Sequence, residues 1–317
     1  MSLTIWCNLP LAADAQAKLM GVTVRHRLLL ATTAEPSDTH QLDEADVAFG
    51  QPDPERCAAL THLAWVHLSS AGYTAYDNPS VRTAFARRKA ALTNSSAVYA
   101  DPCAEHALSF MLADARQLPR SFAHQLGDRA WTSTETRASS ILLRRQTVAL
   151  VGFGAIARRL AALLAPFSLE VVGVRRAPLG NEGIPVVALD AADALLGRAH
   201  HVVNLLPATR DTVRFFDARR FALLRPGARF YNIGRGSTVD HEALRAALEA
   251  RHLGAAYLDV ADPEPLPPDH PLWSTPGCFI TPHSAGGHAG ETVRLVEHFL
   301  SNLDRYVAGQ PLQDRVF

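Results

Sequence analysis

Residues 147–176 read TVALVGFGAIARRLAALLAPFSLEVVGVRR, and this stretch decides the fold. An apolar run at 147–152 leads into a glycine turn, a segment with helical spacing continues to Pro166, and a second apolar run occupies 169–174. Continuous apolar runs of this length are typical of parallel strands that are covered on both faces. The stretch therefore predicts a strand, a helix and a second, parallel strand.

The glycine turn reads GFGAIA and fits the pattern G-x-G-x-x-A at Gly152, Gly154 and Ala157. In a dinucleotide-binding unit the first glycine makes the tight turn, the second lets a pyrophosphate approach the backbone, and the third position needs a small residue. The amides of Ala155 and Ile156 then lie at the helix N-terminus, which favours phosphate. An ordinary glycine turn is the alternative, but the strand–helix–strand context favours a dinucleotide site.

Two arginines, Arg175 and Arg176, follow the second strand, where an NAD site carries an acidic residue. An acid accepts hydrogen bonds from the ribose 2′-hydroxyl and repels a 2′-phosphate, whereas a guanidinium pairs with the phosphate. The alternative is a solvated strand end with no role in binding. We expect both arginines to bind the cofactor, which we expect to be NADP, with NADPH preferred over NADH.

Apolar runs alternate with helical spacing over the rest of the 317 residues, a length typical of two domains. We expect a long helix to begin at Asp101 and Pro102, an N-cap residue and a first-turn proline. The other predicted helices are 13–20, 53–60, 240–251 and 291–307. The other predicted strands are 3–9, 23–30, 46–50, 63–69, 90–95, 201–207, 228–234, 254–260 and 278–282. The sequence therefore predicts an α/β protein with two doubly wound parallel sheets.

The composition argues against several classes of protein. A formal net charge of zero argues against a nucleic-acid partner, and no uncharged apolar run of 18 residues exists to cross a membrane. The four cysteines form no CxxC pair, so we expect the reduced thiols of a cytoplasmic protein. His283 and His288 lack the cysteine or carboxylate company of a zinc site, so we expect no metal.

Three later segments carry the chemistry, because each follows a predicted strand and open α/β sheets bind ligands at the carboxyl ends of their strands. An arginine can bind the carboxylate and polarise the ketone of a 2-oxo acid, a histidine can give a proton to the forming alkoxide, and a carboxylate can hold the imidazolium. The segments supply these types as Arg235, Glu264 and His283. They are NIGRGSTVD (232–240), LDVADPEPLPPDHPLW (258–273) and TPHSAGG (281–287).

These motifs resemble those of the D-isomer-specific 2-hydroxyacid dehydrogenases. The resemblance runs along nearly the whole chain, through GxGxxA, NxxRGxxVD, LDVxxxEPLPxxxPLW and TPHxAG in this order. It implies a Rossmann cofactor domain at 99–285, inserted into a flavodoxin-like substrate-binding domain formed by 1–98 and 286–317. It also implies a homodimer, with DPCAEHALSF at 101–110 opening the dimer-forming helix. The apolar residues of that helix are Ala107, Phe110, Met111 and Ala115.

The family's roles fall on particular residues of this chain. Arg235 is implied to bind the substrate, Glu264 to pair with the acid/base, and His283 to be the acid/base. The backbone amides near Ala71 and Gly72 are implied to bind the substrate carboxylate. Asp259 is implied to face the nicotinamide amide. Further cofactor contacts are implied for Leu206, Pro207, Ile233, Asp259, His283 and Ala285.

The arginine at 175, together with LLP at 205–207, is most like the NADP-dependent glyoxylate and hydroxypyruvate reductases of the family. We therefore expect NADPH-dependent reduction of glyoxylate, hydroxypyruvate or a similar 2-oxo acid to the D-2-hydroxy acid. Two alternatives remain: an NAD(P)-sensing binding protein like the family's corepressors, and a short-form phosphoglycerate dehydrogenase. Formate dehydrogenase is disfavoured because that branch pairs its histidine with glutamine, and this chain has Glu264.

Overall fold

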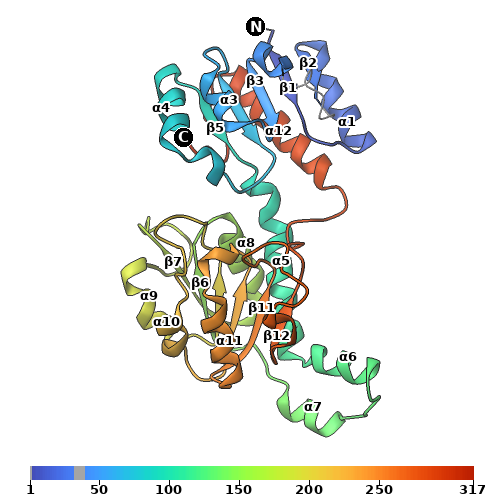
Figure 1. Cartoon of the computed structure of the whole chain (residues 1–317), viewed down its shortest axis with the longest axis vertical. Helices are drawn as coiled ribbons and strands as arrows, with labels where there is room; N and C mark the ends of the chain where they lie inside the picture. The colour runs from blue at the N-terminus through green and yellow to red at the C-terminus, as the bar shows by residue number, and fades with distance from the viewer. Residues whose placement is uncertain (1, 32–39) are drawn as a thin grey trace. The chain divides into compact units, whose positions relative to one another are not determined.

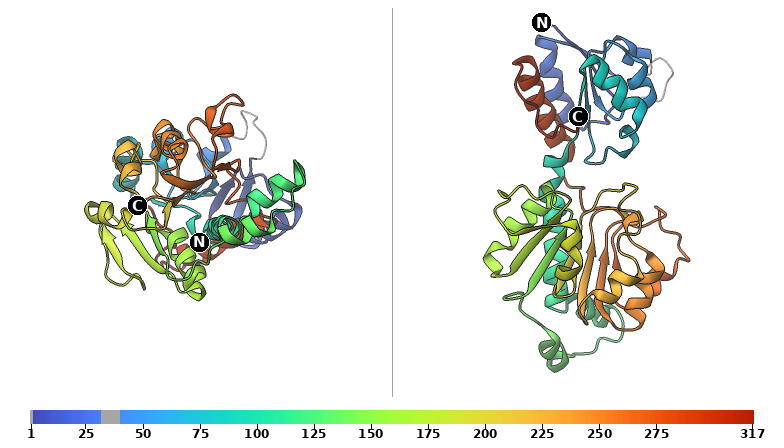
Figure 2. Two further views of the ribbon diagram at one scale, coloured as in Figure 1. Left: turned by 90° about the horizontal axis from the view of Figure 1, so that it is seen from below. Right: turned by 90° about the vertical axis from the view of Figure 1, so that its left-hand side faces the viewer.

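The computed structural model describes residues 2–31 and 40–317, which form two compact units. One unit comprises Met1–Tyr99 and His288–Phe317, and the other comprises Ala100–Gly287. Each unit is a parallel sheet flanked by helices (Figures 1 and 2). The predicted fold class, two doubly wound parallel sheets, is confirmed. No helix within the described ranges is long and apolar enough to cross a membrane.

The first unit is built on a five-stranded sheet. Its strands are β1 (Thr4–Cys7), β2 (Arg27–Leu30), β3 (Val47–Gly50), β4 (Trp65–Leu68) and β5 (Ala91–Thr93), in the order β2-β1-β3-β4-β5. Its helices are α1 (Ala13–Met20), α3 (Pro54–Ala59), α4 (Pro79–Arg88) and α12 (Glu291–Val307). Although α12 comes from the end of the chain, it packs on this sheet, with Phe299 stacked on Phe49 at 4.4 Å between ring centroids. Two distant segments of sequence therefore share one core.

The second unit contains a seven-stranded sheet. Its strands are β6 (Thr147–Val151), β7 (Glu170–Arg175), β8 (Val186–Ala188), β9 (His201–Asn204), β10 (Ala228–Asn232), β11 (Leu253–Leu258) and β12 (Cys278–Ile280). Their order is β12-β11-β10-β9-β6-β7-β8. The chain therefore builds outward from β6 through β7 and β8, then crosses back and builds the other way from β9. Ligands of doubly wound sheets bind at such a reversal, outside the carboxyl ends of the strands.

Seven helices belong to the second unit. Those beside the sheet include α5, α8 and α11, whereas α6 and α7 extend away from the sheet (Figure 1). Their bounds are α5 (Ser96–Ala115, whose first residues belong to the first unit), α6 (Leu118–Leu126), α7 (Ser133–Ser139), α8 (Ala155–Leu164), α9 (Ala192–Leu196), α10 (Ala218–Leu223) and α11 (His241–Glu249).

The predicted start of the long helix is wrong. The helix α5 begins at Ser96 and contains Pro102 in its interior. Two side chains outside α5 accept hydrogen bonds from its first N–H groups. Asn94 Oδ1, just before the helix, accepts from Ser96 N at 3.2 Å, and the distant Asp314 carboxylate accepts from Ala97 N at 2.8 Å. Asp101 instead pairs with Arg159 of α8 at 2.6 Å. A side chain 217 residues away thus caps this helix, which local spacing could not reveal.

The strand predictions were right in place but too long, and one strand was missed. Residues 21–24 form a 3₁₀ turn, so the strand predicted at 23–30 begins only at Arg27. The run predicted at 201–207 ends as a strand at Asn204, where the chain turns into a loop. The missed strand β8 has three half-buried residues at the edge of its sheet. An edge strand lacks the long apolar run that marks a central one.

The buried histidine His201 joins three neighbouring segments of the second unit. Its Nδ1 lies 3.0 Å from the Tyr231 hydroxyl, and its Nε2 lies 2.6 Å from Gln146 Oε1. Because the amide oxygen only accepts, Nε2 carries the proton and Nδ1 accepts from the tyrosine. Burial lowers the pKa of His201 to about 3. His201 is therefore a structural residue in its neutral form.

Candidate active site

The glycine turn after β6 packs tightly against the loop that follows β9. Gly152 has φ +102°, and a Cβ there would lie 2.7 Å from the carbonyl carbon and oxygen of Leu205. A Cβ on Gly234, after β10, would lie 2.8 Å from the carbonyl oxygen of Leu206. Glycine at both positions lets the three strand ends approach one another closely.

Gly154 differs from Gly152, because the packing of the chain does not require a glycine there. A Cβ on Gly154 would meet no described atom within 4 Å. The residue precedes α8, whose first turn exposes the N–H groups of residues 155–157 because no earlier helical carbonyl can accept them. Gly152 N and Phe153 N both donate to Val174 O. These features fit a pyrophosphate that approaches the backbone at the helix N-terminus.

Arg175 closes β7 with a guanidinium that has unused hydrogen-bonding capacity. Its Nη1 is buried and has no hydrogen-bond partner among the described residues. A carboxylate oxygen, Glu182 Oε1, lies 3.6 Å from it. A 2′-phosphate could supply the missing acceptor. Arg175 is therefore suited to the cofactor contact predicted for it.

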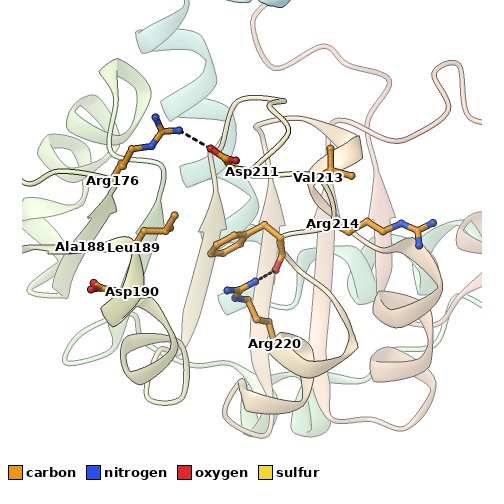
Figure 3. A pocket seen from close by; sticks show the side chains of 9 residues that line it. Arg176, Ala188, Leu189, Asp190, Asp211, Val213, Arg214 and Arg220 are labelled. Carbon is orange, nitrogen blue, oxygen red and sulfur yellow. Dashed lines mark hydrogen bonds and ion pairs between the residues drawn. The ribbon is translucent and has the colours of Figure 1, made fainter.

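Arg176 points toward Asp211 in the loop after β9 (Figure 3). The Arg176 Nη2 to Asp211 Oδ2 distance is 3.4 Å, and both side chains are 76% exposed. Figure 3 shows the pair at a hollow of about 580 Å³ that Leu189 and Val213 also line. Its lining residues follow β7, come from the end of β8 and the turn after it, and follow β9. Of the two arginines, Arg176 is the more exposed, since only 27% of the Arg175 side chain is exposed.

Buried asparagines fix the loops after β9 and β10. Asn204 Nδ2 donates to Asn232 Oδ1 at 2.9 Å and to Thr238 Oγ1 at 2.7 Å, and all three side chains are buried. Asn204 Oδ1 accepts from Leu206 N at 3.2 Å. Thr238 Oγ1 in turn donates to Arg235 O at 2.6 Å. Sequence reasoning did not assign roles to these polar residues, although asparagine at the ends of two apolar strands was a readable signal.

Arg235 is held beside the loop that carries Glu264. Its Nη1 donates to Gly234 O at 2.6 Å, and the side chain is half-buried. A Cβ on the next residue, Gly236, would lie 1.8 Å from Ala261 O, so only glycine allows this approach. Ala261 N donates to Glu264 Oε1 at 2.9 Å. Backbone contacts thus connect the predicted substrate arginine with the predicted carboxylate.

Glu264 and His283 form a direct pair. Glu264 Oε2 lies 2.8 Å from His283 Nδ1, and the two side chains are 37% and 53% exposed. A carboxylate only accepts, so Nδ1 carries a proton and donates it to Glu264. The other nitrogen, Nε2, is left as the atom that can exchange a proton with a ligand. The geometry therefore suits an imidazole that acts as acid and base.

The backbone of His283 has φ +50°, a conformation that side chains rarely adopt. Asp259, which is 3% exposed, holds this turn. Its carbonyl oxygen accepts from His283 N at 2.8 Å, and its carboxylate accepts from Ser284 N at 2.9 Å and Ala285 N at 3.0 Å. Asp259 thus positions the histidine, a role that sequence reasoning missed. Its contact with the nicotinamide amide stays a prediction.

The helix α5 reaches the same turn through His106. Thr281 Oγ1 donates to Asp259 Oδ1 at 2.6 Å, so it accepts from His106 Nε2 at 3.1 Å. Burial lowers the pKa of His106 below its ordinary value, and the Asp259 carboxylate partly opposes this shift. Burial also raises the pKa of Cys103 on the same helix to about 12, with Asp259 adding to the effect. His106 therefore belongs to the site, which sequence reasoning had not recognised.

Ala71 and Gly72 belong to the first unit, in a loop whose carbonyls are bonded within that unit. Ser70 O accepts from Ser95 N at 3.0 Å, Ala71 O from Asn94 Nδ2 at 2.8 Å, and Gly72 O from Ser70 Oγ at 2.7 Å. The N–H groups of Ala71 and Gly72 have no acceptor among the described residues. They are therefore free to donate to an anion, and their binding of the substrate carboxylate stays a prediction.

Comparisons with known proteins find relatives among the 2-hydroxyacid dehydrogenases, both in sequence and in structure. The sequence model described as D-isomer specific 2-hydroxyacid dehydrogenase, NAD binding domain, matches residues 108–285. Glyoxylate/hydroxypyruvate reductase B of Citrobacter koseri is 31% identical over 243 residues, which cover 75% of this chain and 74% of that protein. D-3-phosphoglycerate dehydrogenase of Mycobacterium bovis is 33% identical over 257 residues, which cover 77% of this chain but 47% of that protein.

A solved structure matches this chain along its whole length. It is a D-isomer specific 2-hydroxyacid dehydrogenase from Xanthobacter autotrophicus Py2, crystallised in complex with NADPH and MES. It superposes with a TM-score of 0.83 at 25% sequence identity, and the match covers 100% of this chain and 98% of that one.

Proposed function

Because this chain belongs to the D-isomer-specific 2-hydroxyacid dehydrogenases, NAD(P)-dependent oxidoreductases that act on CH–OH groups, we propose that it reduces a small 2-oxo acid with NADPH. Glyoxylate, hydroxypyruvate or a similar acid is the substrate, and the D-2-hydroxy acid is the product. The observation that carries this proposal is the 2.8 Å contact between His283 and Glu264, which follow the carboxyl ends of β12 and β11.

The catalytic roles follow from the atoms that each side chain leaves available. A bound reduced nicotinamide supplies the hydride. Arg235 binds the substrate carboxylate and polarises its ketone, because a guanidinium offers two parallel donors. His283, protonated on both nitrogens, gives the Nε2 proton to the carbonyl oxygen as that oxygen becomes an alkoxide. Glu264 holds the Nδ1–H throughout, so His283 is left as the neutral imidazole once the hydroxyl has formed.

The preference for NADPH rests on Arg175. A hydrogen bond to a charged group contributes roughly 1.5–3 kcal/mol, which corresponds to about 10- to 100-fold in affinity. The dehydrogenase from Xanthobacter, which binds NADPH, supports the same choice of cofactor here. We expect kcat/KM to be higher with NADPH than with NADH, and we expect Arg175→Asp to weaken NADPH use far more than NADH use. An equal or higher kcat/KM with NADH would contradict the preference.

Two other functions are open, and one assay separates them. The chain covers 47% of the Mycobacterium phosphoglycerate dehydrogenase, so a short form of that enzyme is a candidate. A cofactor-sensing binding protein is the other. The assay supplies glyoxylate, hydroxypyruvate and 3-phosphohydroxypyruvate, each with NADPH and with NADH. Turnover of the first two supports the proposed function, turnover of the phosphorylated acid alone supports the dehydrogenase, and cofactor binding without turnover supports the binding protein.

The homodimer is also proposed, but on different residues from those first expected. Ala107, Met111 and Ala115 of α5 are buried within the chain itself, so they are unavailable to a partner. Exposed apolar side chains instead gather on and beside α6 and α7, where Leu126 is 87% exposed and Trp131 is 93% exposed. A second copy of the chain could cover them. Light scattering at micromolar concentration should give twice the chain mass, and a monomer would contradict the proposal.

A further inference from the structure

The loop that follows β7 places a carboxylate beside the arginine on which the cofactor preference depends. Glu182 Oε1 lies 3.6 Å from Arg175 Nη1, and the Glu182 side chain is 3% exposed. This distance is too long for a hydrogen bond, so the two groups form an ion pair without one. Arg175 therefore keeps its donors for another acceptor, while an acidic group remains close to its charge.

Glu182 is fixed in this position by its own loop. Its Oε1 accepts from Leu179 N at 2.5 Å. This hydrogen bond is the main cause that lowers the pKa of Glu182 below its ordinary value, and Arg175 adds to the shift. The carboxylate is therefore ionised at neutral pH, and the bond to Leu179 prevents it from simply rotating away when an anion approaches Arg175.

We propose that Glu182 is a specificity-determining residue that limits the preference for NADPH. The inference rests on the proposed binding of the 2′-phosphate by Arg175. A phosphate close enough to accept from that guanidinium also lies within a few ångströms of Glu182, and like charges at this range repel. The uncharged 2′-hydroxyl of NADH meets no such repulsion. Glu182 thus weakens NADPH binding selectively, and the site tolerates both cofactors.

The arginine that follows Arg175 also has an acidic neighbour, because Arg176 Nη2 lies 3.4 Å from Asp211 Oδ2. The end of β7 therefore presents two arginines, each with an acidic neighbour. This site therefore differs from one in which arginines alone face the phosphate. The strength of the preference for NADPH over NADH depends on Glu182.

The test uses nucleotides that differ only in the 2′-phosphate, so it needs no turnover. Binding of 2′,5′-ADP and of 5′-AMP is measured by calorimetry on the whole protein and on Glu182→Gln. Glutamine retains a side-chain oxygen that can accept from Leu179 N and has nearly the same volume, but it removes the charge. We expect Glu182→Gln to bind 2′,5′-ADP roughly tenfold more tightly, while binding of 5′-AMP changes less than twofold.

Two further variants make the outcome decisive. Glu249→Gln removes the same charge from α11, where Glu249 pairs with Arg245, and it should leave both nucleotides at their original affinity. Arg175→Ala should weaken 2′,5′-ADP alone. If Arg175→Ala does so but Glu182→Gln leaves 2′,5′-ADP binding unchanged or weaker, the inference is overturned and the cofactor proposal stands. If Arg175→Ala changes neither nucleotide, the cofactor proposal itself fails.

Discussion

In the proposed reaction, Glu264 determines which nitrogen of His283 faces the substrate. The 2.8 Å contact keeps a proton on Nδ1 and leaves Nε2 for chemistry. A glutamine at this position could still accept from Nδ1–H, but it could not compensate the imidazolium charge. We therefore expect Glu264→Gln to lower kcat/KM for glyoxylate by about 10- to 100-fold, the worth of a charged hydrogen bond.

The matched control for this change is Asp269→Asn, which removes a carboxylate from the exposed part of the same segment. It should reduce kcat/KM less than twofold. NADPH affinity, measured by fluorescence titration, should stay the same in both variants. A Glu264→Gln enzyme with the original rate would show that the pair does not act in proton transfer.

His106 is connected to the same turn by hydrogen bonds that run through Thr281 to Asp259. His106→Ala removes the donor to Thr281 Oγ1 at 3.1 Å and loosens the turn that Asp259 holds. We expect kcat to fall roughly tenfold, because the variant loses about one hydrogen bond that holds the turn in place. The KM for NADPH should be unchanged. His106→Gln offers an N–H donor and should recover part of the loss. Equal rates in the alanine variant and the unchanged enzyme would exclude this positioning role.

The turn before α8 gives a prediction at the level of a secondary-structure element. Gly154→Val adds a side chain whose Cβ would meet no described atom within 4 Å, at a backbone φ of −109° that valine accepts. The thermal midpoint should therefore change little. NADPH binding should weaken at least 10-fold, because the side chain occupies the space in front of the helix N-terminus.

Gly152→Val is the counterpart, and it should give the opposite pattern. Its Cβ would collide with Leu205 at a φ of +102°, so the protein should lose stability or fail to fold. Differential scanning calorimetry and NADPH titration distinguish the two variants. If Gly154→Val binds NADPH as tightly as the unchanged protein, the glycine turn does not hold the pyrophosphate.

The elements show where sequence reasoning succeeds. The strands β6 and β7 and the helix α8 follow from apolar runs and one glycine turn, because their determinants lie within 30 residues. The start of α5 could not be found in the same way, since Asp314 caps it from the other end of the chain. The strand β8 was missed because an edge strand needs only three half-buried residues.

The same distinction applies to the candidate site. The motifs identified Glu264 and His283, which the fold brings into direct contact. They did not identify His106 or Glu182, because each acts through a neighbour that only the fold supplies. Residues that contact a ligand carry local signatures, whereas residues that position them are visible only in three dimensions.

At the scale of the whole molecule, the buried histidine His201 predicts how stability depends on pH. Its folded pKa of about 3 lies below the ordinary value of 6.5. A depressed pKa means that the contribution to stability is complete above pH 6.5 and is lost as pH falls, because the unfolded chain then binds the proton that the folded chain excludes. Between pH 7 and pH 5, this one histidine should lower the free energy of unfolding by about 2 kcal/mol.

Urea unfolding at several pH values, followed by circular dichroism, tests this dependence. His201→Gln should be less stable at pH 7, because it disturbs the bonds to Gln146 and Tyr231. Between pH 7 and pH 5, the free energy of unfolding of His201→Gln should nevertheless fall by about 2 kcal/mol less than that of the unchanged protein. The same loss in both proteins would mean that His201 is protonated in the fold.

The most direct test of the proposed reaction compares the unchanged enzyme with His283→Ala, using glyoxylate and NADPH at pH 7. The rate of NADPH oxidation and the affinity for NADPH are measured on the same samples. We expect His283→Ala to lose roughly 10²- to 10⁴-fold in rate, the usual contribution of a positioned acid, while NADPH binds as before. Near-normal turnover by His283→Ala would exclude His283 as the proton donor, because the proton would then come from another group.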